Sequence, residues 1–354
     1  MSHARRLRLT PRATIGRGGV YPLALLGAGS ERSRRAEAAK SRGQAPPRPV
    51  ASASVSITPY IYKVASGCEV KADVHRLADG GVRPAIVWIH GGALIMGHRG
   101  NLPDRQRELY VNAGFVVVSI DYRLAPEAKL DAIIEDVRDA FRWVREEGQE
   151  LYGVDGSRVA AVGHSGGGYL ALMSGWCVAP RPQAVVSFYG YGDIAGAWYS
   201  RPDAYYCGLP AVSKEEAYAA VGGPVISANE GAHHRDRFYL YCRQQGLWPK
   251  EVTGYDPSTL LGAGPVTQPQ EFDRYCPVRN VTRDYPPTML LHGTADTDVP
   301  YRLSVDMADA LARAGVEHEL ITIEGGGHGF DGADTAEVAA MLERVVEFLK
   351  RHVG

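Results

Sequence analysis

Short apolar runs that alternate with helical patterns constrain the fold of this chain more than any other feature. The runs Ala85–Ile89 and Phe115–Ile120 lack polar alternation, a pattern typical of strands buried on both faces of a sheet. Further runs of this kind cover Val159–Val162, Ala184–Phe188, Thr288–Leu291 and Glu319–Ile323. Helices are expected over Leu130–Glu147, Gly166–Cys177, Leu303–Ala314 and Thr335–His352. The alternation predicts the α/β class, with a mostly parallel central sheet covered by helices on both faces.

Two other segments are expected to complete this domain. Ile57–Val64 and Glu69–Arg76 have the composition of strands and are separated by a short glycine-containing turn, which predicts a hairpin. Residues 191–287 contain no buried-strand run but many aromatic residues, prolines and glycines. A stretch of this length within a compact domain predicts an inserted cap. Its helical pieces are expected around Ser213–Ala220 and Arg235–Gln245.

The first fifty residues differ in charge from the rest of the chain. Residues 1–50 hold eleven basic and two acidic residues, a net charge of +9, whereas the remainder carries −10. Pro46, Pro47 and Pro49 block regular structure at the end of this segment. We therefore predict a disordered Arg-rich extension over 1–50 and a folded domain over 51–354. The short apolar run Val20–Gly29 leaves an export or transit signal open as an alternative.

Composition excludes several classes of protein. The acidic folded part argues against a nucleic-acid-binding surface, and no apolar run approaches the roughly 18 residues that span a bilayer. No metal-ligand spacing is visible, so neither a metal nor a cofactor is expected. The five cysteines are scattered without a C-x-x-C pair, which favours reduced thiols and a cytoplasmic protein. They are Cys68, Cys177, Cys207, Cys242 and Cys276.

A G-x-S-x-G motif carries the strongest chemical signal. Gly163-His164-Ser165-Gly166-Gly167 stands between a predicted buried strand and a predicted helix. In that context a sharp turn projects the serine hydroxyl, and the helix N-terminus favours developing negative charge. The motif also occurs by chance in glycine-rich chains, but its flanking elements favour a nucleophile. We therefore predict that Ser165 is the nucleophile.

A serine nucleophile needs a base and a group that orients the base. His328 stands in a glycine-rich loop after a predicted strand, a context better suited to reaching a neighbouring site than to core packing. Asp296 follows another buried strand, and we predict it as the acid because residues 296–300 read D-x-x-V-P. Asp298, two residues later, stays open as the alternative. The order Ser165, Asp296, His328 is the order of an α/β-hydrolase triad.

The chain also offers amide groups for an oxyanion. His90-Gly91-Gly92-Ala93 follows the strand Ala85–Ile89, and its glycines leave backbone N–H groups free. We predict that the amides of Gly91, Gly92 and Gly166 form an oxyanion hole. The simpler interpretation, a glycine turn between a strand and a helix, is compatible with this role.

Five motifs in order resemble the α/β-hydrolase superfamily, specifically esterases and lipases with an H-G-G-G-type loop, similar to hormone-sensitive lipase and feruloyl esterase. The motifs are H-G-G-A (90–93), D-Y-R-L-A-P-E (121–127), G-H-S-G-G (163–167), H-G-T-A-D-T-D-V-P (292–300) and G-G-G-H-G-F (325–330). The resemblance implies an α/β-hydrolase fold, hydrolysis of carboxylic esters through an acyl-enzyme, and a small-molecule ester as the partner. It also implies that residues 121–123 brace the oxyanion loop rather than act in catalysis.

Two features bear on the substrate. Ala93 replaces the third glycine of H-G-G-G, so its Cβ is expected to narrow the acyl pocket and to be strained at a positive φ. The predicted cap is rich in aromatic side chains, which either line an apolar pocket or form the core of the cap, and for any single one we favour the core. They are Trp198, Tyr199, Tyr205, Tyr206, Phe238, Tyr239, Tyr241 and Trp248.

Two alternative functions remain. The prolyl oligopeptidase family shares the fold and the triad order, although about fifty residues before the domain are too few for its β-propeller, so an aminopeptidase-like member is the nearest rival. A non-catalytic receptor with a hydrolase fold is less favoured because such proteins usually lack a triad residue. The sequence identifies neither the ester nor the oligomeric state.

Overall fold

The computed structural model describes residues 6–7, 54–230, 234–255 and 270–354. Its strands are β1 (Arg6–Leu7), β2 (Val55–Ala65), β3 (Cys68–Leu77), β4 (Arg83–Ile89), β5 (Val116–Ile120), β6 (Val154–His164), β7 (Val185–Phe188), β8 (Thr288–Gly293) and β9 (His318–Ile323). Its longer helices are α1 (Asp104–Asn112), α2 (Leu130–Glu146), α4 (Gly166–Cys177), α8 (Arg235–Gln245), α11 (Arg302–Ala314) and α12 (Ala336–His352).

Shorter helices connect these elements. They are α3 (Gly148–Tyr152), α5 (Ala197–Ser200), α6 (Ala204–Cys207), α7 (Lys214–Tyr218) and α9 (Trp248–Thr253), with 3-10 turns η1 (Arg99–Asn101), η2 (Gln270–Tyr275), η3 (Pro277–Arg279) and η4 (Phe330–Gly332). The sequence pattern did not predict α1, α3, α5, α6 or α9, but every buried strand and every long helix that it did predict is present.

The strands form one sheet in the order β1-β9-β8-β7-β6-β4-β5-β3-β2. Along this order, every pair from β1 to β5 is parallel, whereas β3 pairs antiparallel with both of its neighbours, β5 and β2. The predicted hairpin and the mostly parallel sheet are therefore confirmed. Parallel strands bring their carboxyl ends to one edge of the sheet, where the loops after β4, β6, β8 and β9 meet.

Helices cover both faces of the sheet, as predicted. Side chains of β4 show why, because Val87 and Ile89 pack into the core beneath α2 and α4, whereas Ile86 and Trp88 pack into the core beneath α1 and α12. All four side chains are fully buried. A strand segment buried on both faces favours apolar residues at successive positions, which explains the unbroken apolar run at residues 85–89.

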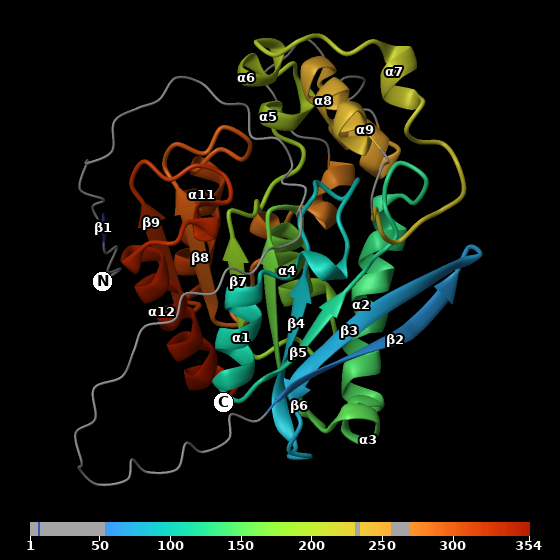
Figure 1. Ribbon diagram of the computed structural model, residues 1–354. Coiled ribbons are helices and arrows are strands. Elements are labelled where there is room, and N and C mark those ends of the chain that lie inside the picture. Colours follow the sequence, from blue (N-terminus) through green and yellow to red (C-terminus); the bar gives the residue numbers. More distant parts are fainter. Residues whose placement is uncertain (1–5, 8–53, 231–233, 256–269) are drawn as a thin grey trace, which may run out of the picture. The chain divides into compact units, whose positions relative to one another are not determined.

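Helices α5 to α9 lie beyond the carboxyl ends of the central strands, in the upper part of Figure 1. They come from the stretch between β7 and β8, and the described residues of that stretch contain no strand. The expected helical pieces at 213–220 and 235–245 correspond to α7 and α8. A cap is thus placed above the sheet edge where the site is expected.

The N-terminal expectation is not tested. Of residues 1–50 the structure describes only Arg6 and Leu7, which pair with Thr322 and Ile323 of β9. The rest of the predicted extension and the alternative signal at 20–29 lie outside the described residues. None of the helices in the described parts of the chain is long and apolar enough to cross a bilayer.

Candidate active site

Ser165 occupies the sharp turn between β6 and α4. Its φ of 54° and ψ of −119° form a conformation that a non-glycine residue adopts only under strain. A Cβ on Gly163 would overlap the carbonyl oxygen of Gly167, and a Cβ on Gly167 would overlap that of Ile89. The two glycines therefore permit the close backbone approach of this turn. The serine lies at the N-terminus of α4, as the motif predicts.

His328 lies in the loop after β9 and contacts Ser165. Its Nε2 is 3.0 Å from Ser165 Oγ, and its Nδ1 is 2.8 Å from Oδ2 of Asp296. An ionised carboxylate only accepts hydrogen bonds, so Nδ1 carries the proton of the neutral ring. Nε2 is then free to accept the hydrogen bond that the serine hydroxyl donates. The ring of Tyr189, whose centroid is 4.6 Å away, packs against the imidazole.

The two candidate aspartates face different nitrogens of His328. The Asp296 side chain is fully buried, and its Oδ1 accepts the backbone N–H groups of Asp298 and Val299 at 2.8 and 2.9 Å. Oδ2 of Asp298 instead lies 3.5 Å from Nε2 of His328. The geometry therefore places Asp296, and not Asp298, where the acid of a triad acts.

A second histidine supports Asp296. His292 Nε2 lies 3.2 Å from Asp296 Oδ2 and 3.0 Å from the carbonyl oxygen of Val299, while its Nδ1 lies 2.7 Å from Ser304 Oγ. His292 is the penultimate residue of the buried strand β8 and is itself fully buried, so it fixes the carboxylate from the sheet side. The sequence motif contains His292, but its spacing alone does not reveal this contact.

Charges and burial shift the pKa values of Asp296 and His328 in opposite directions. Burial raises the pKa of the Asp296 carboxyl, but hydrogen bonds from His292 and His328 and the charge of His328 lower it more, so the pKa lies well below its usual value. Burial lowers the pKa of His328, yet the charges of Asp298, Asp296 and Asp331 raise it above the usual value. Both shifts favour a protonated imidazole beside ionised carboxylates.

The loop after β4 lies against the serine turn. A Cβ on Gly91 would stand 3.3 Å from Ser165 Cβ, and a Cβ on Gly166 would stand 3.2 Å from the amide nitrogens of Ala93 and Leu94. Gly92 has a φ of 99° and no room for a Cβ beside the Met96 carbonyl. The structure thus brings the predicted glycines together at the serine. It adds the amides of Ala93 and Leu94, which the motif did not single out.

Ala93 has a φ of 54°, the positive value at which a Cβ was expected to be strained. Trp248 of α9 donates from Nε1 to the Ala93 carbonyl oxygen at 2.9 Å. The peptide that departs from the H-G-G-G pattern is therefore held by the cap. Holding it offsets part of the cost of the backbone conformation.

Residues 121–123 contact structural groups. Tyr122 donates from its hydroxyl to the His90 carbonyl oxygen at 3.0 Å, and its ring stacks on His90. Asp121 pairs with Arg99 at 2.8 Å, whereas Arg123 pairs with the buried Asp136 at 2.7 Å. The bonds of Tyr122 and Asp121 brace the segment after β4, whereas the Arg123 pair ties residues 121–123 to α2.

A buried network that sequence analysis missed joins the histidine loop to the serine turn. Asp331 accepts hydrogen bonds from Tyr189 Oη and Gln106 Nε2, both at 2.8 Å. Its Oδ2 is also 3.2 Å from Nε2 of His164, the residue before the nucleophile. The partners come from distant parts of the chain, so no local pattern identifies them.

The cap aromatics are mostly core residues, as favoured above. Phe238, Tyr239, Tyr199 and Trp248 are buried, whereas Tyr205 is 47% exposed. The rings of Tyr199 and Trp248 stack with centroids 4.0 Å apart. The buried cap aromatics are therefore continuous with the apolar core that lies beneath α2 and α4.

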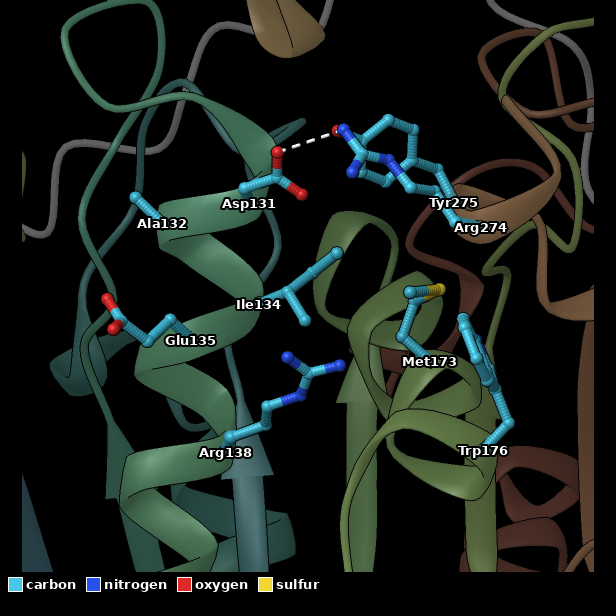
Figure 2. Close-up of a pocket in the computed structure, with 9 residues that line it drawn as sticks. All are labelled: Asp131, Ala132, Ile134, Glu135, Arg138, Met173, Trp176, Arg274 and Tyr275. Carbon is cyan, nitrogen blue, oxygen red and sulfur yellow. Dashed lines mark hydrogen bonds and ion pairs between the residues drawn. The ribbon is translucent and has the colours of Figure 1, made fainter. Parts of the chain in front are cut away.

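A cavity of about 580 Å³ lies elsewhere, between α2, α4 and η2 (Figure 2). An ion pair at 3.0 Å between Asp131 and Arg274 crosses its rim. No predicted site residue lines it. The lining residues are Asp131, Ala132, Ile134, Glu135, Arg138, Met173, Trp176, Arg274 and Tyr275.

Comparison with solved structures reveals the same fold. A Staphylococcus aureus protein of unknown function has a TM-score of 0.67 at 21% identity, covering 84% of this chain and 100% of that one. The thermophilic esterase Est2 of Thermogutta terrifontis, with butyrate bound, has a TM-score of 0.59 at 23% identity, covering 83% and 94%. At these identities the likeness concerns the fold.

Two family models match successive parts of the sequence. The BD-FAE model matches residues 75–203, and the prolyl oligopeptidase family model matches residues 243–354. The chain belongs to the α/β-hydrolase superfamily. The first match contains the serine turn and the second contains both other members of the hydrogen-bonded triad. The predicted α/β-hydrolase fold and the relation to prolyl oligopeptidases are therefore confirmed.

Curated relatives of this α/β-hydrolase are much longer proteins. Non-reducing polyketide synthase ausA of Aspergillus calidoustus is 34% identical over 344 residues, which cover 83% of this chain and 14% of that one. Non-reducing polyketide synthase adrD of Penicillium roqueforti is 30% identical, with the same two coverages. The chain thus spans about a seventh of the length of these relatives.

The raised pKa of His328 yields a prediction. Asp296→Asn removes a charge that favours the imidazolium, so the pKa of His328 should fall. The groups that remain around the ring are Asp298, Asp331 and Tyr189. NMR titration of the imidazole measures the shift, and Asp306→Asn, on the exposed side of α11, should leave it unchanged. An unaltered His328 pKa in Asp296→Asn would contradict the pairing.

The raised pKa of His328 also makes the free energy of unfolding depend on pH. Because the folded pKa is raised, the protonated ring stabilises the fold fully below its unfolded pKa of about 6.5. That contribution is lost as the pH rises through the folded-state pKa. Asp296→Asn should therefore reduce the difference in unfolding free energy between acidic and neutral pH.

Proposed function

We propose that this α/β-hydrolase is a serine hydrolase that cleaves carboxylic esters through an acyl-enzyme. The observation that carries the proposal is the continuous hydrogen-bonded chain from Ser165 Oγ through His328 to Asp296. The strained serine turn supports it, because strain of this kind is retained where function requires a particular geometry. The small-molecule partner would be an ester, and the residues need no cofactor for this reaction.

The contacts support the following mechanism. His328 Nε2 takes the proton of Ser165 as Oγ attacks the ester carbonyl carbon, and Asp296 stabilises the imidazolium. The predicted amide groups of Gly91, Gly92 and Gly166, with the amide of Ala93 beside them, donate to the oxyanion. The imidazolium then protonates the leaving alcohol. In the second half, water attacks the acyl carbon and Ser165 is regenerated.

Two other acyl donors suit the same residues. A peptide bond is favoured by the match of residues 243–354 to the prolyl oligopeptidase family. A thioester is favoured by the polyketide synthases among the relatives, since group carriers such as CoA hold acyl chains as thioesters. A receptor without activity is less favoured, because the three side chains are hydrogen-bonded in a catalytic arrangement. The cytoplasmic location stays a prediction.

Removal of the nucleophile tests the proposal. Ser165→Ala should lower the hydrolysis of p-nitrophenyl acetate and butyrate by at least about 10³-fold, because the acyl-enzyme cannot form. Release of p-nitrophenol by purified protein measures the rate. Ser157→Ala, at an exposed position of β6, should retain wild-type activity. Equal rates in wild type and Ser165→Ala would contradict the proposed function.

The scissile bond is tested by matched acyl donors. We expect the oxygen ester of a given acyl group to react faster than the corresponding amide. An amine is a poor leaving group that must be protonated, and among the described residues only His328 is placed to protonate it. Rates for the ester, the N-acetylcysteamine thioester and the aminoacyl amide, each compared with Ser165→Ala, separate the three classes. An amide rate above the ester rate would favour a peptidase.

Ala93 is predicted to limit acyl length. Ala93→Gly removes a Cβ beside the oxyanion amides and relieves a positive φ, so hydrolysis of p-nitrophenyl octanoate should rise relative to acetate. The ratio of the two kcat/KM values measures this preference. An unchanged ratio would show that the cap, and not Ala93, sets the acyl length.

A further inference from the structure

Asp298 has one carboxylate oxygen that is fully occupied and one that is not. Its Oδ1 accepts hydrogen bonds from Tyr206 Oη at 2.7 Å, Tyr239 Oη at 2.5 Å and Arg243 Nη1 at 2.7 Å. Its Oδ2 lies 3.5 Å from Nε2 of His328 and accepts no hydrogen bond from the residues that the structure describes. The side chain retains 18% exposure. A fixed acceptor is therefore left beside the nitrogen that exchanges protons with Ser165.

The cap holds this carboxylate rigidly. Arg243 is 1% exposed, and its guanidinium also pairs with Asp203 at 3.0 Å and lies over the rings of Tyr206 and Tyr199. Its Nη1 donates to the backbone carbonyl oxygen of Asp298 at 3.0 Å as well. A buried ion pair contributes little net stability because desolvation costs about as much as the pairing returns. The ion pair therefore contributes more to holding the Asp298 carboxylate in one position than to stability. A carboxylate held in one position is suited to positioning a reactant.

From this arrangement, which rests on the proposed serine-hydrolase function, we propose that Asp298 Oδ2 and His328 Nε2 together hold the water that hydrolyses the acyl-enzyme. A water needs one hydrogen bond to each atom, at about 2.8 Å. Asp298 Oδ2 and His328 Nε2 are 3.5 Å apart, so one water can bond to both atoms if the angle between its two hydrogen bonds is acute. Both of its hydrogens then point at acceptors, and an oxygen lone pair is left for the acyl carbon.

The step balances as follows. The water oxygen forms a bond to the acyl carbon while one water proton passes to His328 Nε2. The other hydrogen stays on the oxygen and is donated to Asp298 Oδ2, which takes no proton. The bond between the acyl carbon and Ser165 Oγ then breaks, and His328 returns its proton to Oγ. The products are the carboxylic acid and the free serine.

This role concerns only the second half of the reaction. During acylation the leaving alcohol, which carries no second hydrogen, occupies the place beside Nε2. Loss of the Asp298 acceptor should therefore slow deacylation more than acylation. A general effect of the negative charge on His328 would change both halves, because the same imidazole acts in each.

Asp298→Asn tests the proposal sharply. The three donors at Oδ1 require an oxygen there, so the amide NH₂ group should take the place of Oδ2 and offer a donor where an acceptor is needed. With p-nitrophenyl acetate, steady-state turnover should fall by about 10- to 100-fold. Mass measurement of acid-quenched protein should show acetylated Ser165 accumulating, while the rate of its formation stays within about threefold of wild type.

Asp298→Glu is the second variant, because it keeps the charge but displaces the acceptor by one methylene group. It should also accumulate acetyl-enzyme, and hydroxylamine, a strong nucleophile that bypasses the water, should restore turnover in both variants. Asp104→Asn, at an exposed position in the first turn of α1, should match wild type throughout. Thermal unfolding reports whether each variant is folded.

The outcomes separate the two proposals. Equal losses in formation and breakdown of the acetyl-enzyme, or wild-type deacylation in Asp298→Glu, would overturn the role of Asp298 and leave the serine hydrolase intact. If the variants slow acylation only for esters that carry a hydroxyl near the carbonyl, Asp298 recognises the substrate and does not position the water. Wild-type protein that is never acetylated on Ser165 would overturn the proposed function itself.

Discussion

The close approach between the serine turn and the loop after β4 is the constraint on which the rest of the site depends. Gly167 lies against the carbonyl groups of Ile89 and His90, so even a methyl group there would separate the two segments. The same approach sets Gly166 beside the amides of Ala93 and Leu94. One packing contact between the end of β4 and the start of α4 therefore positions both Ser165 and the amides that we propose stabilise an oxyanion.

The cap contributes to this arrangement through its hydrogen bonds to the sheet domain. Trp248 binds the Ala93 carbonyl oxygen, and Arg235 donates to the Ile95 carbonyl oxygen at 2.9 Å, so the cap holds the oxyanion loop on one side. Arg243 and Tyr239 hold Asp298 on the other side. The cap therefore does more than cover the site: its hydrogen bonds also hold the residues on two sides of the site in place. Changes in the cap core would then alter reactivity without touching Ser165.

Sequence analysis predicted the parts of this molecule that depend on local pattern. The buried part of β4, residues 85–89, is an unbroken apolar run, and Ser165 and His328 each stand in a turn with a recognisable composition, so all three could be found without coordinates. The contacts of Asp331 with Gln106, or of Arg243 with Asp298, join residues far apart in the chain. Such pairs have no spacing to recognise. The choice between Asp296 and Asp298 required the fold for the same reason.

The separation of these two aspartates follows from the backbone between them. Asp296 turns inward because its Oδ1 accepts the N–H groups of Asp298 and Val299, and this small hydrogen-bonded loop directs the Asp298 side chain to the cap. One carboxylate then lies at Nδ1 of His328 and the other near Nε2. In the proposed reaction, the first would orient the ring in both halves, whereas the second would face the position that alcohol and water occupy in turn. A single short loop after β8 thereby supplies two negative charges that act at different atoms of one base.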